Sequence, residues 1–474
     1  MKPVRFFNTY SGKLEEFKPL HGNEVRMYTC GPTVYDYAHI GNFRAYVFED
    51  LLRRFLKFKG LPVKQVMNLT DVDDKTIRGA REKGVTLNEF TKTYADAFFE
   101  DIRTLNLEPA EFYPRATEHI PEMTQLIEKL VQKGHAYEKD GSVYYRVTSF
   151  EKYGKLSKKD LTQNIAGARV DVDEYEKEAG SDFALWKKKK EGEPAWPSPW
   201  GEGRPGWHIE CSVMSMKYLG ETFDLHTGGE DNIFPHHENE IAQSEGATGA
   251  PFVRYWLHCR FLLVDGEKMS KSKGNFYTLR DLLKKGYDPI QIRYVLISSH
   301  YRQPLNFTFA GLGAAKEALE RLDHFYARVT DPLLKAPSKK DSLETIFKKG
   351  LERFEESLSN DLGIPEALAS VFDAVRGANQ KMDREEFSQG DLESAKPFLQ
   401  KVDSVLGLRI AEGGAPPEAL LKLLKEREEA RAKKEFSRSD EIRRQIHSQG
   451  WLVKDGRAGE SSQLKQRKRV WESD

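Results

Sequence analysis

The feature of this sequence that most restricts its fold is a pair of short apolar runs separated by a long amphipathic stretch. Residues 25–29 form the first run, which ends at Cys30-Gly31-Pro32, and residues 63–69 form the second. Between them, apolar residues of 39–59 recur at the three- and four-residue intervals of a helix with one buried face. Strand, helix and strand of these lengths predict a βαβ unit with two parallel strands and a right-handed crossover.

The rest of the chain divides by composition into three further parts. Short strands such as 142–148 alternate with lysine-rich loops between residues 115 and 200, so we expect an insertion there. Strands resume at 222–226 and 253–264, and long amphipathic stretches follow residue 309. The prediction is an α/β fold, in which a Rossmann-like parallel sheet nucleotide domain with an insertion precedes an all-α helical C-terminal domain.

Charge and cysteine content exclude several classes of protein. The chain has 74 basic and 74 acidic side chains among 474 residues, so net charge gives no argument for nucleic-acid binding, and any RNA contact must use local basic patches. Three cysteines are too few for a disulfide framework and favour metal binding, catalysis or burial. Because no apolar run of about 18 residues occurs, we expect a soluble, cytoplasmic protein without membrane contact.

Two polar motifs have the composition of a triphosphate site. His39-Ile40-Gly41-Asn42 falls at the predicted helix start, where free backbone N–H groups and the positive dipole end favour phosphate. Lys268-Met269-Ser270-Lys271-Ser272 follows an apolar strand and is predicted to lie on a loop. A given five-residue string occurs by chance on the order of 10⁻⁴ times in a chain of this size. Taken singly, the motifs also fit a half-buried histidine and a solvated basic loop.

Four side chains are candidate metal ligands: Cys30, Cys211, His236 and Glu240. His236 and Glu240 are four residues apart, hence on one face of a helix that Pro235 can start. Thiolate, imidazole and carboxylate are all ordinary zinc ligands. No spacing rule gathers these four residues, and the two cysteines fit equally well as small buried apolar side chains.

Several segments resemble the cysteinyl-tRNA synthetases almost residue for residue: 30–36, 68–75, 203–212 and 234–240. The two phosphate motifs, about 230 residues apart, resemble the paired signatures of the class I aminoacyl-tRNA synthetases. The resemblance is close over residues 20–310 and looser elsewhere. The family form of the first motif ends in a second histidine, and here Asn42, which cannot carry a proton, takes that place.

The resemblance implies a role for each candidate residue. One zinc ion per chain is implied at Cys30, Cys211, His236 and Glu240, and a cysteine pocket at Gly31, Thr70 and Trp207. Catalysis is implied for His39, Lys268 and Lys271, and ATP binding for these three with Gly41, Asn42, Gly228, Gly229 and Asp231. Cys259 lies outside these motifs, and we expect it to be structural.

The implied activity is that of a cysteine–tRNA ligase. ATP, with Mg²⁺, would activate L-cysteine to cysteinyl-adenylate, which then passes to the 3′ end of tRNA(Cys). An apolar pocket separates cysteine from serine poorly, whereas zinc prefers sulfur, so zinc would select the thiolate without an editing domain. The implied partners are ATP, L-cysteine and tRNA(Cys), and we expect a monomer.

We predict five regions: 1–114, the first half of the catalytic domain; 115–200, a connective insertion; 201–258, its second half; 259–330, the lysine loop and stem-contact region; and 331–474, a helical anticodon-binding domain. Candidate linkers lie at 331–342 and 413–417. Candidate anticodon contacts are Trp451, Lys454, Arg457, Lys465, Arg467, Lys468, Arg469 and Trp471.

Three alternatives stay open on the sequence. A mycothiol-pathway cysteine ligase would share the fold, zinc site and adenylate chemistry but join cysteine to an amino sugar, which needs no helical basic C-terminus. A non-catalytic RNA-binding or zinc-sensing paralogue is disfavoured by intact His39, Lys268 and Lys271. A zinc hydrolase using His236-His237-Glu238 lacks the His-Glu-x-x-His spacing and leaves the lysine loop unexplained.

Overall fold

The computed structural model describes residues 2–159, 182–331, 334–337, 343–410, 418–433, 435–448, 451–454 and 463–466. The chain divides into two compact units. The first consists of residues 1–289, 295–309 and 356–365, and the second of 290–294, 310–355 and 366–474. Among the described residues, no helix combines the length and apolar character needed to span a membrane.

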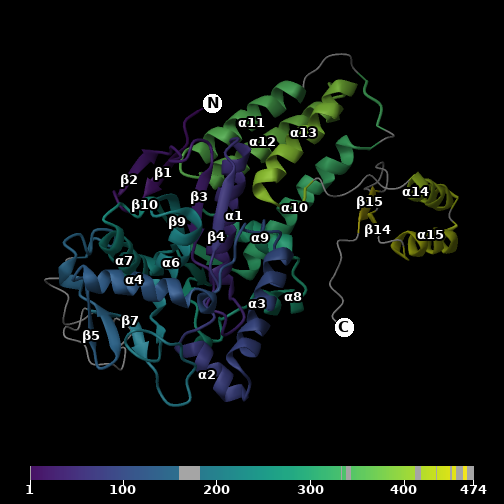
Figure 1. Cartoon of the computed structure of the whole chain (residues 1–474). Coiled ribbons are helices and arrows are strands. Elements are labelled where there is room, and N and C mark those ends of the chain that lie inside the picture. Colours follow the sequence, from purple (N-terminus) through teal and green to yellow (C-terminus); the bar gives the residue numbers. More distant parts are fainter. Residues whose placement is uncertain are drawn as a thin grey trace. The chain divides into compact units, whose positions relative to one another are not determined.

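The first unit is built from four sheets and their helices (Figure 1). Up to residue 132 its elements are β1 (Arg5–Asn8), β2 (Lys13–Glu16), β3 (Val25–Thr29), α1 (Ile40–Phe58), β4 (Val63–Met67), α2 (Asp74–Lys83), α3 (Leu87–Thr104) and α4 (Ile120–Gln132). There follow β5 (Ala136–Lys139), β6 (Ser142–Tyr145), β7 (Phe183–Lys188), β8 (Gly203–Pro205), α6 (Trp207–Leu219), β9 (Phe223–Gly229), α7 (Glu238–Thr248), β10 (Val253–Cys259), β11 (Leu262–Val264), β12 (Glu267–Lys268), α8 (Leu279–Lys284) and β13 (Leu305–Phe307).

The central sheet is parallel, with the strand order β10-β9-β3-β4. Two consecutive residues of β9 show that helices cover both of its faces. Thr227 donates to Glu49 Oε1 of α1 at 3.0 Å, while His226 Nε2 lies 2.9 Å from Glu240 Oε2 of α7. Because neighbouring residues of a strand point to opposite faces, α1 and α7 lie on opposite sides of the sheet. This is a Rossmann-like layering, as predicted.

The insertion forms an antiparallel sheet in the order β5-β6-β7-β8. Its last strand leads through Gly206 directly into α6. A Cβ on Gly206 would lie only 2.0 Å from the carbonyl oxygen of Ala184, so this close crossing of two backbone segments requires glycine. The insertion thereby positions the start of α6, which carries Trp207 and Cys211.

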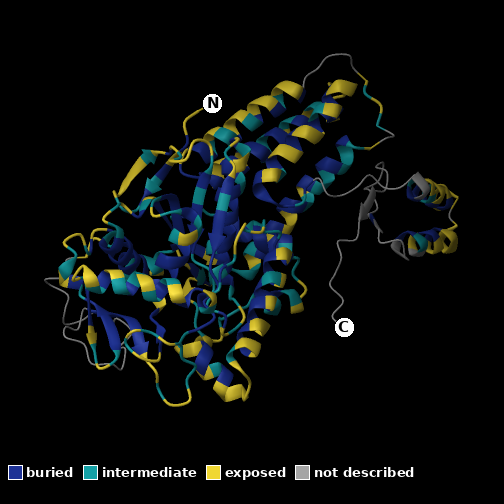
Figure 2. Ribbon diagram, viewed as in Figure 1, coloured by how far each residue is buried: buried dark blue, intermediate teal, exposed yellow. Residues whose placement is uncertain are grey.

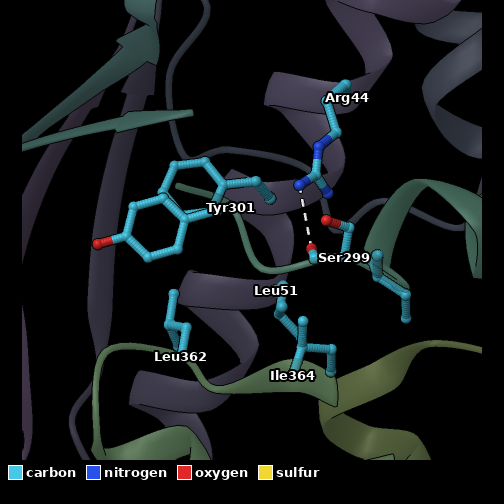
Figure 3. Close-up of a pocket in the computed structure, with 8 residues that line it drawn as sticks. Arg44, Leu51, Ser299, Tyr301, Leu362 and Ile364 are labelled. Atoms are coloured by element: carbon cyan, nitrogen blue, oxygen red, sulfur yellow. Dashed lines mark hydrogen bonds between the residues drawn. The ribbon is translucent and has the colours of Figure 1, made fainter. Parts of the chain in front are cut away.

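Arg44 ties α1 to the chain that follows the parallel sheet. Its guanidinium is buried and donates to the carbonyl oxygens of Leu296, Ser299 and His300, the last two at 3.0 Å. Figure 3 shows this contact beside a small cavity, whose other lining side chains are mostly apolar: Phe48, Leu51, Ile297, Tyr301, Leu362 and Ile364. Backbone carbonyls occupy the terminal nitrogens of Arg44, so this cavity serves packing.

The second unit is predominantly helical. Its main helices, four of which have end residues in the first unit, are α9 (Pro289–Ile297), α10 (Phe309–Val329), α11 (Leu343–Ser359), α12 (Ile364–Asp383) and α13 (Gln389–Leu406). Phe347 of α11 stacks on Phe398 of α13 with ring centroids 5.1 Å apart, and the Leu343 amide donates to Asp391 at 2.7 Å. The helices present buried faces to one another and exposed faces to solvent (Figure 2).

A small final group of elements adds strands to the predicted all-helical region. It comprises α14 (Glu418–Ala432), α15 (Phe436–Ser448), β14 (Trp451–Lys454) and β15 (Gln463–Gln466), with the two strands antiparallel. Leu420, Ile442 and Val453 share its apolar core. The linker predicted at 413–417 lies outside the described residues, as do Arg457, Arg467, Lys468, Arg469, Trp471 and the side chains of Trp451, Lys454 and Lys465.

The predicted βαβ unit is confirmed, although its second strand, expected at 63–69, ends at Met67. Three predicted strands elsewhere also have different limits. The strand expected at 142–148 ends at Tyr145 and is followed by a 3-10 turn over 147–149. The stretch 253–264 divides into β10 and β11. The strand expected at 222–226 runs from Phe223 to Gly229 and so extends three residues beyond its predicted end. Glycine weakens a strand pattern in sequence, although parallel pairing to β10 holds these residues in the sheet.

Candidate active site and metal centre

The order in which successive strands are added to the parallel sheet reverses between β3 and β9. β4 lies on one side of β3, whereas β9 and β10 extend the sheet on the other. Ligands of open parallel sheets bind outside the carboxyl ends of the strands at such a reversal. Cys30 directly follows β3 and donates its backbone N–H to Thr227 O near the end of β9 at 3.3 Å. The topology therefore brings the predicted metal and ATP residues to one edge of the sheet.

The four predicted metal ligands converge from four different elements. Cys30 follows β3, Cys211 lies in α6, His236 in a π-turn over residues 233–237, and Glu240 in the first turn of α7. One ligand atom from each residue lies within 4.8 Å of the others. Cys211, His236 and Glu240 are buried, and His236 Nε2 lies 3.0 Å from Glu240 Oε1.

Two features of this donor set fit a bound cation. Glu240 Oε1 is buried and has no hydrogen-bond partner, although His236 Nε2 is so near. The two atoms thus face each other without hydrogen-bond geometry, as two ligands of one ion do. Burial opposes ionisation of Glu240, but His226 and His236 outweigh it and bring the pKa of this carboxyl to about 2. A buried carboxylate beside two thiols matches the ligand chemistry of zinc.

The two thiols differ in their acidity. Burial raises the pKa of Cys30 well above its usual value, an effect strengthened by the hydrogen bond to Cys211 and its charge. Burial also opposes ionisation of Cys211, but the hydrogen bond from Cys30 and the neighbouring His236 bring its pKa to about 6. One thiolate at neutral pH is thus favoured by the protein alone, and a divalent cation would favour the second.

A second, overlapping group of possible ligands consists of Cys30, His226, His237 and Glu240. Cys30 Sγ lies 3.2 Å from His237 Nε2. The other ring nitrogen of His237 lies 2.8 Å from His258 Nε2, which in turn contacts Thr9 through its Nδ1. Sequence reasoning missed His226, His237 and His258 as neighbours of the candidate ligands. The adjacent pair His236-His237 was the available signal, but only the fold reveals which ring faces the thiols.

The three predicted cysteine-pocket residues lie around this cluster. Trp207 is 40% exposed and stacks on the His236 ring at 4.1 Å between centroids. Thr70 is buried and donates to Glu210 Oε2 at 2.8 Å. Gly31 donates to Asn68 Oδ1 at 2.9 Å, and a Cβ there would lie 1.7 Å from the Asn68 carbonyl oxygen. Glycine is therefore required at position 31.

The first phosphate motif caps α1. Asn42 donates its backbone N–H to His39 Nδ1 at 3.1 Å, and its side-chain oxygen accepts from the His39 backbone N–H at 3.1 Å. This reciprocal pair is a capping box. Burial lowers the pKa of His39 below its usual value, although Asp231 acts in the opposite direction. Since Nδ1 accepts a hydrogen bond, the neutral ring carries its proton on Nε2.

The lysine motif lies beside this helix start. Lys268 is exposed on β12, and Lys271 begins a 3-10 turn over residues 271–273. Ile40 donates its backbone N–H to Tyr277 O at 3.0 Å, and a Cβ on Gly41 would lie 3.3 Å from the Met269 methyl. The two predicted phosphate motifs, about 230 residues apart, therefore meet. Lys271 Nζ forms an ion pair with Asp36 Oδ2 at 2.8 Å, a contact that the sequence did not predict.

The remaining predicted ATP residues lie at the end of β9 and in the turn that follows it. Gly228 and Gly229 are the last residues of the strand, and Asp231 is exposed in a 3-10 turn. A Cβ on Gly228 would lie 2.9 Å from His237 Cε1, so this glycine permits close packing against the histidines. Cys259 is buried at the end of β10 with Sγ 3.8 Å from the Arg44 carbonyl oxygen, and it belongs to neither ligand group found among the described residues.

The family described as tRNA synthetases class I (C) catalytic domain matches residues 16–317, and the DALR domain matches residues 353–411. A curated protein of Protochlamydia amoebophila named cysteine–tRNA ligase is 50% identical over 461 residues, covering 96% of each chain. The chain belongs to the cysteine branch of the class I tRNA synthetases. Another member, a cysteine–tRNA ligase of Solibacter usitatus, is 51% identical over 460 residues, covering 96% of this chain and 98% of that one.

Solved structures support the fold of this class I synthetase. The methionyl-tRNA synthetase of Mycobacterium tuberculosis, in complex with methionyl-adenylate, superposes with a TM-score of 0.61 at 16% identity. The match covers 82% of this chain and 90% of that chain. At this identity the likeness establishes the shared architecture, and the predicted fold class is confirmed.

Proposed function

We propose that this chain is a cysteine–tRNA ligase, which activates L-cysteine with ATP and transfers it to the 3′ end of tRNA(Cys). The observation that carries the proposal is the convergence of Cys30, Cys211, His236 and Glu240 within 4.8 Å. This donor set adjoins the sheet edge where the phosphate motifs belong. Relatives that are about 50% identical over nearly their full length carry the same activity in their names.

We assign these four residues to one Zn²⁺, which would prefer the sulfur of cysteine to the oxygen of serine and hold it as thiolate. Trp207 stacks on the His236 ring and so holds it in place. Thr70 and Gly31 border the amino-acid pocket, and their hydrogen bonds to Glu210 and Asn68 fix its walls.

His39 is suited to donate a hydrogen bond to the phosphates. Its Nδ1 is occupied by the Asn42 backbone N–H, which leaves Nε2–H as the donor. Burial keeps the ring neutral near pH 7, because it lowers the pKa. The donor stabilises charge that develops as the cysteine carboxylate attacks the α-phosphorus and pyrophosphate leaves. Asn42 maintains this geometry through the capping box, a role that does not require a second proton carrier.

Lys268 and Lys271 supply positive charge to the leaving pyrophosphate, together with Mg²⁺. Gly41, Asn42, Gly228, Gly229 and Asp231 are assigned to ATP binding. In the second step a ribose hydroxyl at the tRNA 3′ end attacks the adenylate carbonyl carbon, and AMP leaves. We propose that the region 331–474 binds the anticodon and that the five regions have the boundaries predicted from the sequence. We also propose that the protein is a cytoplasmic monomer.

The decisive experiment measures zinc content and ATP–pyrophosphate exchange on purified protein. We expect about one zinc per chain and exchange that depends on cysteine, with serine at least about 100-fold less effective. A metal-free active protein, or equal use of serine, would reject the proposed selection by zinc. Absence of any cysteine-dependent exchange would instead favour the non-catalytic paralogue.

Charging of total tRNA separates the ligase from the amino-sugar alternative. Both enzymes would give cysteine-dependent exchange, but only the ligase would form cysteinyl-tRNA. The DALR match over residues 353–411 favours the ligase, because an amino sugar offers nothing for a long helical region to bind. Exchange without charging, accompanied by amino-sugar coupling, would overturn this assignment.

A further inference from the structure

We propose that Asp36 is a positioning residue that holds Lys271 in the ATP-free enzyme and releases it to the triphosphate. The proposal rests on the proposed function, since it takes Lys271 to serve the leaving phosphates. Lys271 Nζ lies 2.8 Å from Asp36 Oδ2. The structure therefore records Lys271 with a protein carboxylate as its partner, at the site where phosphate oxygens are expected.

The Asp36 carboxylate has a fixed orientation. Its Oδ1 accepts the backbone N–H of Tyr37 at 2.9 Å, which leaves Oδ2 for the lysine. The lysine ammonium also lies 5.1 Å from the centre of the Phe276 ring, which forms a T-shaped contact with the His39 ring at 5.2 Å between centroids. Phe276 therefore connects Lys271 to His39, the residue that we propose donates to the phosphates.

The ion pair between Lys271 and Asp36 is strong enough to hold the lysine in the ATP-free enzyme and weak enough for ATP to replace Asp36. The side chains of Lys271 and Asp36 are 68% and 36% exposed, and exposed ion pairs of this kind are worth about 0–1 kcal/mol. A triphosphate with its metal presents several negative charges to the same ammonium. ATP therefore displaces Asp36 at a cost that is small but measurable in its apparent affinity.

The chain is anchored on both sides of Lys271. After the motif, Tyr277 accepts from Ile40, and Arg280 forms ion pairs with Glu100 and, at 3.1 Å, with Asp101. Before it, the hairpin of β11 and β12 holds Lys268. Lys273, in the same turn, is paired with Glu267 inside the hairpin at 2.8 Å and does not approach Asp36. Of the two lysines in this turn, Lys271 is therefore the one that forms the ion pair with Asp36, close in sequence to the His39 motif.

The test compares Asp36→Asn with the wild-type full-length enzyme in cysteine-dependent ATP–pyrophosphate exchange. Asparagine keeps the size of the side chain and removes its charge. We expect the KM for ATP to fall about twofold to fivefold, the range that an exposed pair allows, while kcat stays within about twofold. Asp36→Glu, which can re-form the pair, should restore the wild-type KM.

Two further variants identify the partner. In a Lys271→Ala background, Asp36→Asn should change the KM for ATP by less than about 1.5-fold, since the residue it holds is gone. Glu267→Gln, which frees Lys273 in the same turn, should leave the KM for ATP unchanged. An equal effect of Asp36→Asn in both backgrounds, or a raised KM, would mean that Asp36 serves ATP or Mg²⁺ directly and would overturn the proposal.

Tryptic cleavage of the ATP-free enzyme gives a second readout that is independent of turnover. Loss of the ion pair should speed cleavage after Lys271 by about the same twofold to fivefold, and ATP with cysteine should protect both forms. Equal cleavage rates of Asp36→Asn and wild type would contradict the holding role. Failure of the proposed function appears differently, as wild-type enzyme without cysteine-dependent exchange.

Discussion

The ligand cluster and the lysine turn both lie near the carboxyl edge of the parallel sheet but are built in opposite ways. Cys211, His236 and Glu240 are buried, and each has its position set by the helix or turn that carries it. Lys268 is exposed on a short hairpin and Lys271 in the turn that follows it, where one replaceable ion pair holds Lys271. Under the proposed function, the first region would select cysteine by fixed donors, and the second would respond to the ATP that arrives.

The difference follows from what each substrate offers. Cysteine and serine differ by a single atom, so discrimination requires donors fixed in place before binding. Triphosphate offers high charge and little shape, so flexible ammonium groups suffice, and their engagement late in the reaction favours the transition state. Removing parts of the two regions should therefore affect different kinetic constants.

The largest effect is expected from Cys211→Ser. Loss of a buried thiolate should remove most of the bound zinc and raise the KM for cysteine more than about 100-fold, because even outer-shell changes at metal sites cost about 10- to 100-fold. The KM for ATP should change less than about threefold. Zinc analysis and exchange kinetics test this, with Cys259→Ser as the matched control that keeps its metal. An equal rise in the KM values for cysteine and ATP would contradict the separate roles of the ligand cluster and the lysine turn.

Lys271→Ala should act on the other region alone. We expect kcat of adenylate formation to fall about 100-fold, as when one charge-stabilising donor is removed, with the KM for cysteine unchanged. Lys273→Ala is the matched control, since its ammonium pairs with Glu267 within the hairpin, and it should stay near wild-type activity. Pyrophosphate exchange under saturating cysteine measures both. An unchanged rate in Lys271→Ala would remove this lysine from the mechanism.

A pair of histidine variants decides between the two overlapping ligand groups. His236→Asn should abolish zinc binding, whereas His237→Asn should keep the metal and weaken cysteine binding about 10-fold through the altered contact with Cys30. Metal content by mass spectrometry and cysteine titration separate the two results. Zinc retained in His236→Asn and lost in His237→Asn would transfer the site to the group containing His226.

The sequence predicted local elements well because their signals are local. The periodicity of residues 39–59 and the flanking apolar runs correspond to β3, α1 and β4 within a few residues. It failed where tertiary pairing decides, as at Gly228 and Gly229, whose strand state depends on the neighbouring β10. The strands β14 and β15 were likewise outside the reach of helical periodicity.

The sequence predicted which residues belong to the site better than it predicted which of them lie next to one another. Cys30, Cys211, His236 and Glu240 were candidates by chemistry and by resemblance, but no spacing rule could bring them together. The reversal of strand order between β3 and β9 does so. The same holds for Asp36 and Lys271, which lie in motifs at opposite ends of the catalytic region and meet only in the fold.

Two buried glutamates, Glu240 among the candidate ligands and Glu49 on α1, differ in how burial affects the pKa of the carboxyl group. Glu240 has imidazole neighbours and a pKa near 2, whereas burial raises the pKa of Glu49 to about 8, despite a hydrogen bond from Thr227. Since the Glu49 value exceeds its ordinary 4.5, the folded state binds a proton that the unfolded state releases, and stability falls as pH rises from about 4.5 to 8.

Glu49→Gln imitates the protonated carboxyl and removes that dependence. At pH 8 the variant should be more stable than wild type by on the order of 4 kcal/mol, a difference that vanishes near pH 4.5, with activity changed less than about threefold. Urea unfolding at a series of pH values measures the difference. If the free energy of unfolding varied with pH in the same way in both proteins, Glu49 would be ionised in the folded state, as Glu240 is. Burial on the α1 face of the sheet would then affect a carboxyl group no differently from burial among the candidate metal ligands.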